Sequence, residues 1–217
     1  MEYEVRFYYP ISEKDKLLEQ IQKIDSLTIG KRKYEKTVQY DHPCEKMSFY
    51  RKKIDGRFRI RVTKDNDESK CKISWKRRLP STIEENVNKE EEVELNIEYS
   101  EYKNLMFLID NVLKMKCVES YERYRTTIYN DEIEIALDEY PFGLALEIEN
   151  KSQDKNPQQI VEKWTKKLGL DINKAYRLSW DDKYLELCNE QHKKVESIVR
   201  FDKEMPKVTK KFTKSKC

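Results

Sequence analysis

Glu147-Ile148-Glu149 and Glu2-Tyr3-Glu4-Val5-Arg6 are the two stretches that decide the fold. In an extended strand successive side chains point to opposite faces, so each stretch places two carboxylates on one face and apolar residues on the other. A single strand of this kind in a soluble domain would turn its charges toward bulk water. That interpretation becomes less favourable when the same pattern recurs along the chain.

The alternation recurs in several other segments, and each of them carries charge of one sign. The cationic segments are Arg57-Phe58-Arg59-Ile60-Arg61-Val62, Ser74-Trp75-Lys76 and Arg123-Tyr124-Arg125. The anionic segments contain Glu90, Glu92 and Glu94, and then Glu132, Glu134 and Asp138. Charges sorted in this way are expected if the charged faces meet inside a closed sheet whose apolar face is covered by helices. The sequence therefore predicts an α+β protein, a closed antiparallel β-barrel with a charged interior and helices packed outside.

Length and composition narrow the class of protein. The 217 residues suit one domain, and no Gly-, Pro- or Ser-rich linker divides them. With 44 basic and 41 acidic residues the net charge is only +3, so the arrangement of charge matters more than its total. Five dispersed cysteines and two histidines argue against a zinc site or a disulfide framework. No apolar run approaches the roughly 20 residues of a membrane helix, so we expect a cytoplasmic, intracellular protein without membrane contact.

Helices and further strands follow from apolar spacing. Apolar stripes at helical spacing begin after Ser12, after Ser100 and at Asn156-Pro157. Strands are also expected at 34–41 and at 49–53. The apolar stripes predict helices that cover the outside of the barrel.

The regular patterns end near residue 201. Residues 201–217 carry six lysines among Thr, Ser and Pro, so we expect one domain over 1–200 followed by a flexible basic tail. The composition favours a solubilising tail. The alternative is a weak electrostatic contact with nucleic acid such as RNA.

Several motifs together resemble the CYTH superfamily, the triphosphate tunnel metalloenzymes. The opening Glu-x-Glu-x-Lys of that family is similar to Glu2-Tyr3-Glu4-Val5-Arg6, and its "LDE…FLEIE" segment is similar to 137–149. The resemblance covers roughly residues 1 to 190 in the family's order. Two positions depart from the pattern. Arg6 replaces a lysine, and Glu90 stands where many members have a basic residue.

The basic residues are the candidate substrate-binding set. Burying a triphosphate requires several fixed cations, and arginine can bind adjacent phosphate oxygens bidentately. The candidates are Arg57, Arg59, Arg61, Lys72, Lys76, Arg123 and Arg125. The alternative is that these residues form salt bridges to the neighbouring Glu-containing strands. That alternative is less favourable because desolvated pairs are costly without further partners.

The carboxylates are the candidate metal ligands. Mg²⁺ and Mn²⁺ prefer carboxylate oxygens and retain water. The candidates are Glu2, Glu4, Asp138, Glu147 and Glu149, with Glu92 or Glu94 as additions. The resemblance implies a catalytic set of Glu2, Glu4, Arg6, Lys76, Glu147 and Glu149.

The resemblance implies a metal-dependent triphosphatase that releases the γ-phosphate. Its substrate would be inorganic triphosphate, a nucleoside triphosphate, thiamine triphosphate or an RNA 5′ end. Two alternatives remain open. One is an adenylyl cyclase of the same family, in which the ribose 3′ oxygen attacks the α-phosphorus. The other is a non-catalytic polyphosphate-binding module, in which the carboxylates only balance the cations.

Overall fold

A computed structural model of the chain describes residues 1–51, 53–65, 68–80, 87–152 and 156–210. None of the helices within these ranges is long and apolar enough to cross a membrane.

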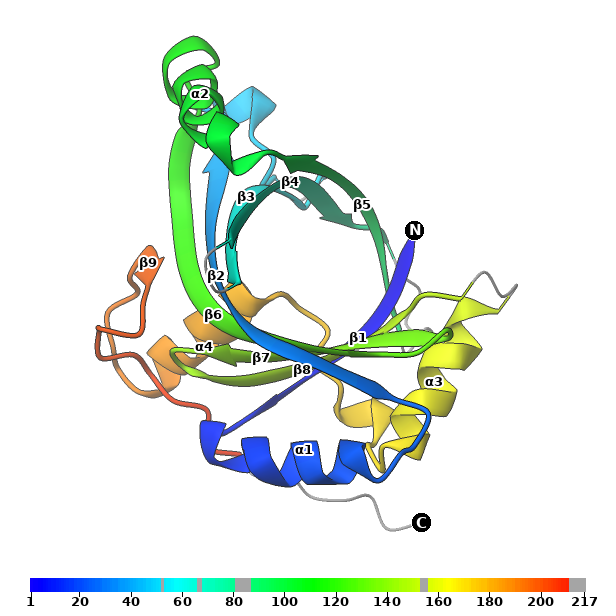
Figure 1. The fold of residues 1–217 in the computed structure, drawn as a ribbon. Helices are drawn as coiled ribbons and strands as arrows, with labels where there is room; N and C mark the ends of the chain where they lie inside the picture. Colours follow the sequence, from blue (N-terminus) through cyan, green and yellow to red (C-terminus); the bar gives the residue numbers. More distant parts are fainter. Residues whose placement is uncertain (52, 66–67, 81–86, 153–155, 211–217) are drawn as a thin grey trace.

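Eight antiparallel strands form a closed barrel, as the sequence predicts (Figure 1). The strands are β1 Glu2–Tyr9, β2 Thr28–Asp41, β3 Gly56–Asp65, β4 Glu68–Arg78, β5 Asn88–Ile97, β6 Lys116–Tyr129, β7 Ile133–Tyr140 and β8 Gly143–Asn150. Their order around the barrel is β2-β3-β4-β5-β1-β8-β7-β6, and the β2–β6 pair closes it. A ninth strand, β9 (Ile198–Val199), pairs with β6 in parallel. Closure removes the exposed edges that an open sheet would present.

The strand register brings the charged motifs face to face inside the barrel. On β1, Glu4 is opposite Glu149, and Arg6 is opposite Glu147. At the other edge of β1, Glu2 is opposite Glu90 of β5. Because side chains alternate along a strand, the odd-numbered residues of β1 point to the outer face while these even-numbered residues point inward.

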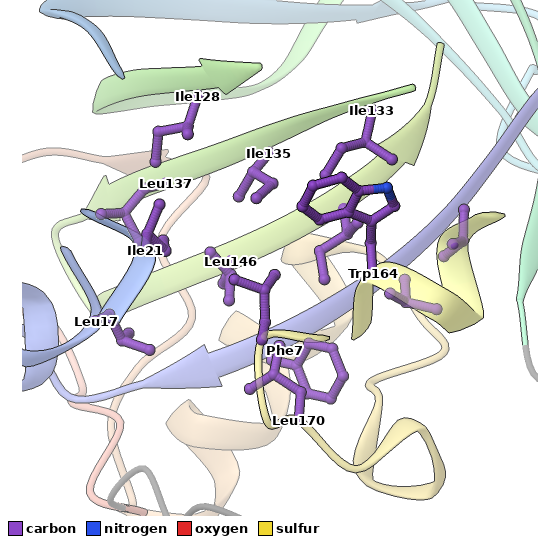
Figure 2. Close-up of a cluster of buried hydrophobic side chains, with 14 of the residues drawn as sticks. Phe7, Leu17, Ile21, Ile128, Ile133, Ile135, Leu137, Leu146, Trp164 and Leu170 are labelled. Atoms are coloured by element: carbon purple, nitrogen blue, oxygen red, sulfur yellow. The ribbon is translucent and has the colours of Figure 1, made fainter. Parts of the chain in front are cut away.

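The largest hydrophobic core lies between the outer face of the barrel and two helices. These are α1 (Lys14–Gln22) and α3 (Pro157–Lys167), which cover the side formed by β1, β7 and β8 (Figure 1). Figure 2 shows Leu17 and Ile21 of α1 beside Leu137, with Trp164 of α3 in the same cluster. Burying each aliphatic side chain contributes about 1.5–3 kcal/mol. The apolar half of each strand therefore holds the barrel together and leaves the interior polar.

A third helix, α2 (Tyr102–Phe107), continues into a π-helical turn at Leu108–Val112 and covers part of β2, β3 and β4. The last helix, α4 (Trp180–Glu190), begins with a capping box in which the Asp182 carboxylate accepts a hydrogen bond from the Ser179 N–H at 3.0 Å. This start fixes the indole of Trp180 against the rings of Tyr121 and Tyr140, with centroids 4.3 and 6.2 Å away. The helix therefore begins against residues that line the barrel interior.

The segment expected as a strand at 49–53 is different in the structure. Its described residues form turns, and the N–H of Gly56 donates to the carbonyl of Phe49 at 2.9 Å. Asp55 has a positive φ of 48°, and a Cβ on Gly56 would lie 2.3 Å from the ring of Trp75. The chain here turns tightly onto a tryptophan, which alternation alone does not reveal. The strand expected at 34–41 is correct but begins earlier, at Thr28.

The first part of the expected tail is packed. Met205 and Val208 are 2% and 6% exposed, in a cluster with Phe142 and Tyr184. The N–H of Val208 donates to the carbonyl of Phe142 at 2.8 Å. Two apolar residues in a lysine-rich stretch are enough to anchor it, so 201–210 differs from the expected flexible tail. The remainder, 211–217, lies outside the described residues.

Candidate active site

The interior of the barrel contains a cavity of about 220 Å³. Among the described residues that line it, ten side chains are basic and ten are acidic. The basic ones are Arg6, Arg57, Arg59, Arg61, Lys72, Lys76, Arg78, Arg123, Arg125 and Lys151. The acidic ones are Glu2, Glu4, Asp55, Glu90, Glu92, Glu94, Glu134, Glu147, Glu149 and Asp181. The lining is therefore formally neutral, although it is densely charged.

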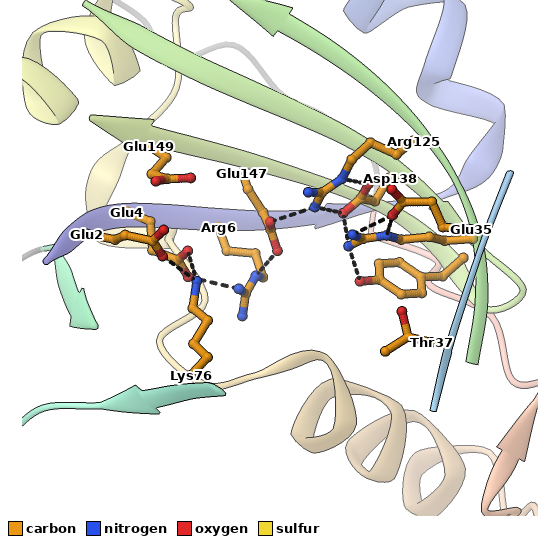
Figure 3. A network of polar contacts seen from close by, with 12 residues as sticks. Glu2, Glu4, Arg6, Glu35, Thr37, Lys76, Arg125, Asp138, Glu147 and Glu149 are labelled. Carbon is orange, nitrogen blue, oxygen red and sulfur yellow. Dashed lines mark hydrogen bonds and ion pairs between the residues drawn. The ribbon is translucent and has the colours of Figure 1, made fainter. Parts of the chain in front are cut away.

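One group of carboxylates surrounds a single ammonium group. One oxygen each of Glu2, Glu4 and Glu90 lie within 4.8 Å of one another. The Nζ of Lys76 lies 2.9 and 3.0 Å from oxygens of Glu2 and Glu4 (Figure 3). It also lies 2.7 Å from Glu90 and 3.7 Å from Glu92. We call Glu2, Glu4 and Glu90 the carboxylate cage. Its donor set of convergent carboxylate oxygens is the kind that Mg²⁺ and Mn²⁺ prefer.

The pKa values around the carboxylate cage show an excess of negative charge. Burial raises the pKa of Glu2 to about 8, even though Lys76 lowers it. Burial also acts on Glu92, but attraction to Lys76 and Arg59 outweighs it and lowers that pKa to about 2. One ammonium therefore does not neutralise the cluster. A divalent cation would supply further positive charge, so the residues present fit such an ion.

A second group holds guanidinium ions against carboxylates. Arg125 donates to both oxygens of Asp138, at 2.7 and 2.6 Å, and to Glu147 at 3.2 Å. Arg6 donates to Glu147 at 2.5 Å and to Glu4 at 2.8 Å (Figure 3). Arg6 therefore links this group to the carboxylate cage. Burial opposes the charged form of Glu147, but attraction to Arg6 and Arg125 outweighs it and holds the pKa well below its usual range.

The remaining predicted cations also have partners. Arg123 binds Glu35 at 2.7 Å and Asp138 at 2.8 Å. The other pairs are Arg59 with Glu92 at 2.9 Å, Arg61 with Glu35 at 3.7 Å, Lys72 with Glu94 at 2.6 Å and Arg57 with Asp181 at 3.1 Å. The residues predicted to bind phosphate therefore form the salt bridges of the alternative interpretation. The two interpretations differ in whether these basic side chains bind a polyanion when one enters the cavity.

The start of α4 supplies residues to the cavity that the sequence did not connect with it. Ser179, Trp180 and Asp181 all line it. Arg57 bonds to Asp181 and lies over the ring of Tyr50, 4.3 Å from its centroid. Arg57 therefore attaches α4 to β3, which is a structural contribution in addition to its predicted phosphate binding.

The predicted metal ligands do not all lie together. Glu2 and Glu4 belong to the carboxylate cage, while Glu149 bonds to Lys151 at 2.7 Å and repels Glu2 electrostatically. Asp138 is fully buried and saturated by arginines, so it positions guanidinium groups away from the carboxylate cage. The third member of the carboxylate cage is Glu90, where the prediction had included Asp138.

Glu90 was not among the metal ligands predicted from the sequence. Its alternation with Glu92 and Glu94 was the available signal. Glu35, Tyr121 and Tyr140 were missed, because Glu35 lies outside the segments of sorted charge and the two tyrosines are uncharged.

The fold and the charged interior define a class of protein. The chain has the closed eight-stranded tunnel barrel of CYTH-type proteins, which confirms the resemblance seen in its motifs. The sequence matches no protein-family model and no curated protein.

Solved structures show which proteins share this barrel. PH1819 from Pyrococcus horikoshii OT3 is 26% identical, with a TM-score of 0.61, over 88% of this chain and 99% of that chain. A proposed adenylate cyclase from Vibrio parahaemolyticus is 15% identical, with a TM-score of 0.60, over 83% and 96% of the two chains. HpAC1 from Hippeastrum, a proposed adenylyl cyclase with a dominant triphosphatase activity, is 19% identical, with a TM-score of 0.56, over 90% and 98%. The last two similarities establish a shared fold.

Proposed function

We propose that this protein is a divalent-metal-dependent triphosphatase that hydrolyses the terminal phosphoanhydride bond of a triphosphate inside the barrel. The observation that carries the proposal is the carboxylate cage of Glu2, Glu4 and Glu90 next to a cluster of buried guanidinium groups in one cavity. A cage for a cation beside fixed cations suits a substrate that is itself a metal-bound polyanion.

The charge balance of the cavity supports a metal. Ten basic and ten acidic side chains cancel, so a bare triphosphate would bring several uncompensated charges into a desolvated space. Mg²⁺ or Mn²⁺ held by Glu2, Glu4 and Glu90, with Glu149 near them, would supply the missing positive charge and withdraw electrons from the terminal phosphate.

The protein's own residues would bind and orient the phosphate chain. Arg59, Arg61 and Arg125 reach the cavity from β3 and β6, and each carries planar donors that match phosphate oxygens. Asp138 and Glu147 hold Arg125 in place by three hydrogen bonds. Water then adds to the terminal phosphorus and the bridging P–O bond breaks, which releases orthophosphate. Catalysis in this arrangement is mainly positioning and electrostatic stabilisation.

The substrate we propose is a small-molecule triphosphate or an RNA 5′ end. The cavity is lined mostly by charged groups, which can bind phosphates and leave the organic part outside. Adenylate cyclase is the second candidate, because two proteins with this barrel are proposed cyclases.

A panel of triphosphates tests the proposal. Inorganic triphosphate, ATP, GTP, thiamine triphosphate and 5′-triphosphorylated RNA would each be incubated with Mg²⁺ or Mn²⁺, and orthophosphate, pyrophosphate and cyclic nucleotide would be scored separately. We expect orthophosphate. Pyrophosphate with cyclic AMP would instead indicate the cyclase, and binding without any turnover would indicate the polyphosphate-binding module.

A further inference from the structure

The ammonium group of Lys76 occupies the position that a divalent ion would need. Lysine has three N–H donors, and the three shortest contacts of Nζ, at 2.7, 2.9 and 3.0 Å, go to Glu90, Glu2 and Glu4. These are the same three residues whose oxygens converge within 4.8 Å. Figure 3 shows the Lys76 side chain crossing the interior toward Glu2 and Glu4. An ammonium group and a divalent ion cannot share this space, because like charges repel.

The geometry also allows Lys76 to leave. Its backbone lies on β4, whereas the carboxylate cage belongs to β1 and β5. Its side chain is 15% exposed to the cavity, and four flexible methylene groups carry the ammonium. Arg59 projects into the same cavity from β3, next to β4. An ammonium displaced from the carboxylate cage would therefore point toward the region where the arginines would bind phosphate.

We propose that Lys76 is an internal competitor of the metal. In the metal-free protein its ammonium fills the carboxylate cage of Glu2, Glu4 and Glu90. Metal binding displaces the ammonium, which then becomes a phosphate-binding group. Metal loading thereby creates a positive group for the substrate, and the protein without metal lacks it. The inference rests on the metal site of the proposed function.

Removing the charge of Lys76 should strengthen metal binding. In the metal-free protein the carboxylate cage is open in only a fraction of the molecules. The apparent affinity for Mn²⁺ equals the affinity of the open cage multiplied by that fraction. If that fraction is about one tenth, Lys76→Met should bind Mn²⁺ about tenfold more tightly than the unchanged protein. Lys76→Arg keeps the charge and should bind Mn²⁺ no more tightly than the unchanged protein.

Calorimetric titration of Mn²⁺ without substrate measures these affinities directly. Lys72→Met is the matched control, because Lys72 lies on the same strand and in the same cavity but pairs with Glu94, outside the cage. Its Mn²⁺ affinity should not change. If Lys76→Met bound Mn²⁺ equally or more weakly than the unchanged protein, the competition would be overturned.

A second measurement needs no variant, in case Lys76→Met does not fold. Acylation of lysine amines, followed by mass spectrometry, would compare Lys76 and Lys72 with and without Mn²⁺. We expect labelling of Lys76 to become faster with Mn²⁺, while labelling of Lys72 does not change. Labelling of Lys76 that is unchanged by saturating Mn²⁺ would overturn the proposal. Neither measurement uses turnover, so a protein that shows the competition but hydrolyses no triphosphate would lose the proposed function and keep this inference.

Discussion

Glu119 shows how burial acts on a carboxyl group whose hydrogen-bond donors are uncharged. It projects from β6 and accepts hydrogen bonds from Gln39 at 2.5 Å and Tyr50 at 3.4 Å. Burial raises its pKa to about 7, and repulsion by Asp181 adds to the effect while Arg57 opposes it. Glu147 is half-buried, yet attraction to Arg6, Arg125 and Arg123 outweighs its desolvation and lowers its pKa. The partners, more than the depth, decide which form of a carboxyl group the fold favours.

This raised pKa predicts a pH dependence of stability. Between the unfolded value near 4.5 and the folded value of about 7, the native protein binds more protons at Glu119 than the unfolded chain does. The contribution of Glu119 to stability is therefore complete below pH 4.5 and is lost as the pH rises through 7. Glu119→Gln removes the titration and keeps the shape. Relative to this variant, the unchanged protein should lose about 1–2 kcal/mol of unfolding free energy between pH 5 and pH 8, after allowance for partial solvent exposure.

Urea unfolding of both proteins across that range measures the difference. A difference that does not vary with pH would show that Glu119 titrates normally in the folded protein.

Glu90 carries the second prediction at this scale. Glu90→Gln removes one oxygen ligand from the carboxylate cage, so the Mn²⁺ concentration that gives half of maximal turnover should rise about tenfold or more. Glu94→Gln is the control, because it removes the same charge from the same strand but disturbs only the pair with Lys72. Manganese titrations of turnover at saturating triphosphate compare the two. Equal effects would mean that Glu90 acts through general charge and not as a ligand.

At the scale of elements, the segment after β9 is packed in the fold, although its lysine-rich composition predicted a flexible tail. Residues 201–210 are rich in lysine, yet Met205 and Val208 lie in the same cluster as Trp180, the first residue of α4. The segment therefore packs against α4, which contributes to the lining of the cavity. Its role is to support that side of the barrel.

Shortening Met205 should therefore destabilise the protein. Met205→Ala creates a cavity in a packed cluster, where the cost is about 2–5 kcal/mol. Met47→Ala provides the comparison, because Met47 is 57% exposed and should change stability by less than about 0.5 kcal/mol. Thermal or urea unfolding of the two variants measures this. Equal stabilities would mean that the segment does not pack as described.

At the scale of the whole molecule, the barrel could be predicted because alternation within one strand shows which of its side chains point inward. Glu4 and Arg6, for example, identify the inward face of β1 without reference to any other strand. Which residues of two strands pair with each other is different, because it depends on the register between strands that are distant in sequence. Glu90 pairs with Glu2, 88 positions away in the sequence, and no local sequence pattern predicts that pairing. For the same reason the contact of α4 with the barrel interior could not be predicted.

The neutral charge balance of the cavity gives a prediction for the whole molecule. Equal numbers of basic and acidic side chains mean that triphosphate alone meets no net attraction, and every carboxylate that pairs with an arginine opposes its entry. Triphosphate and Mn²⁺ together bring compensating charge. A ligand that binds only the folded state stabilises it by about 2.7 kcal/mol at a concentration one hundred times its dissociation constant. We therefore expect a rise in melting temperature with both components and little change with triphosphate alone.

Thermal unfolding with Mn²⁺, with inorganic triphosphate, and with both measures this dependence. To prevent turnover from consuming the ligand, the scans would be repeated with a non-hydrolysable triphosphate analogue. In Arg125→Ala the response to Mn²⁺ alone should persist, because Arg125 contacts Asp138 and Glu147 and lies outside the carboxylate cage, whereas the additional response to triphosphate should be lost. Full stabilisation by triphosphate without metal would contradict the charge argument, because it would require an excess of positive charge that the lining does not have.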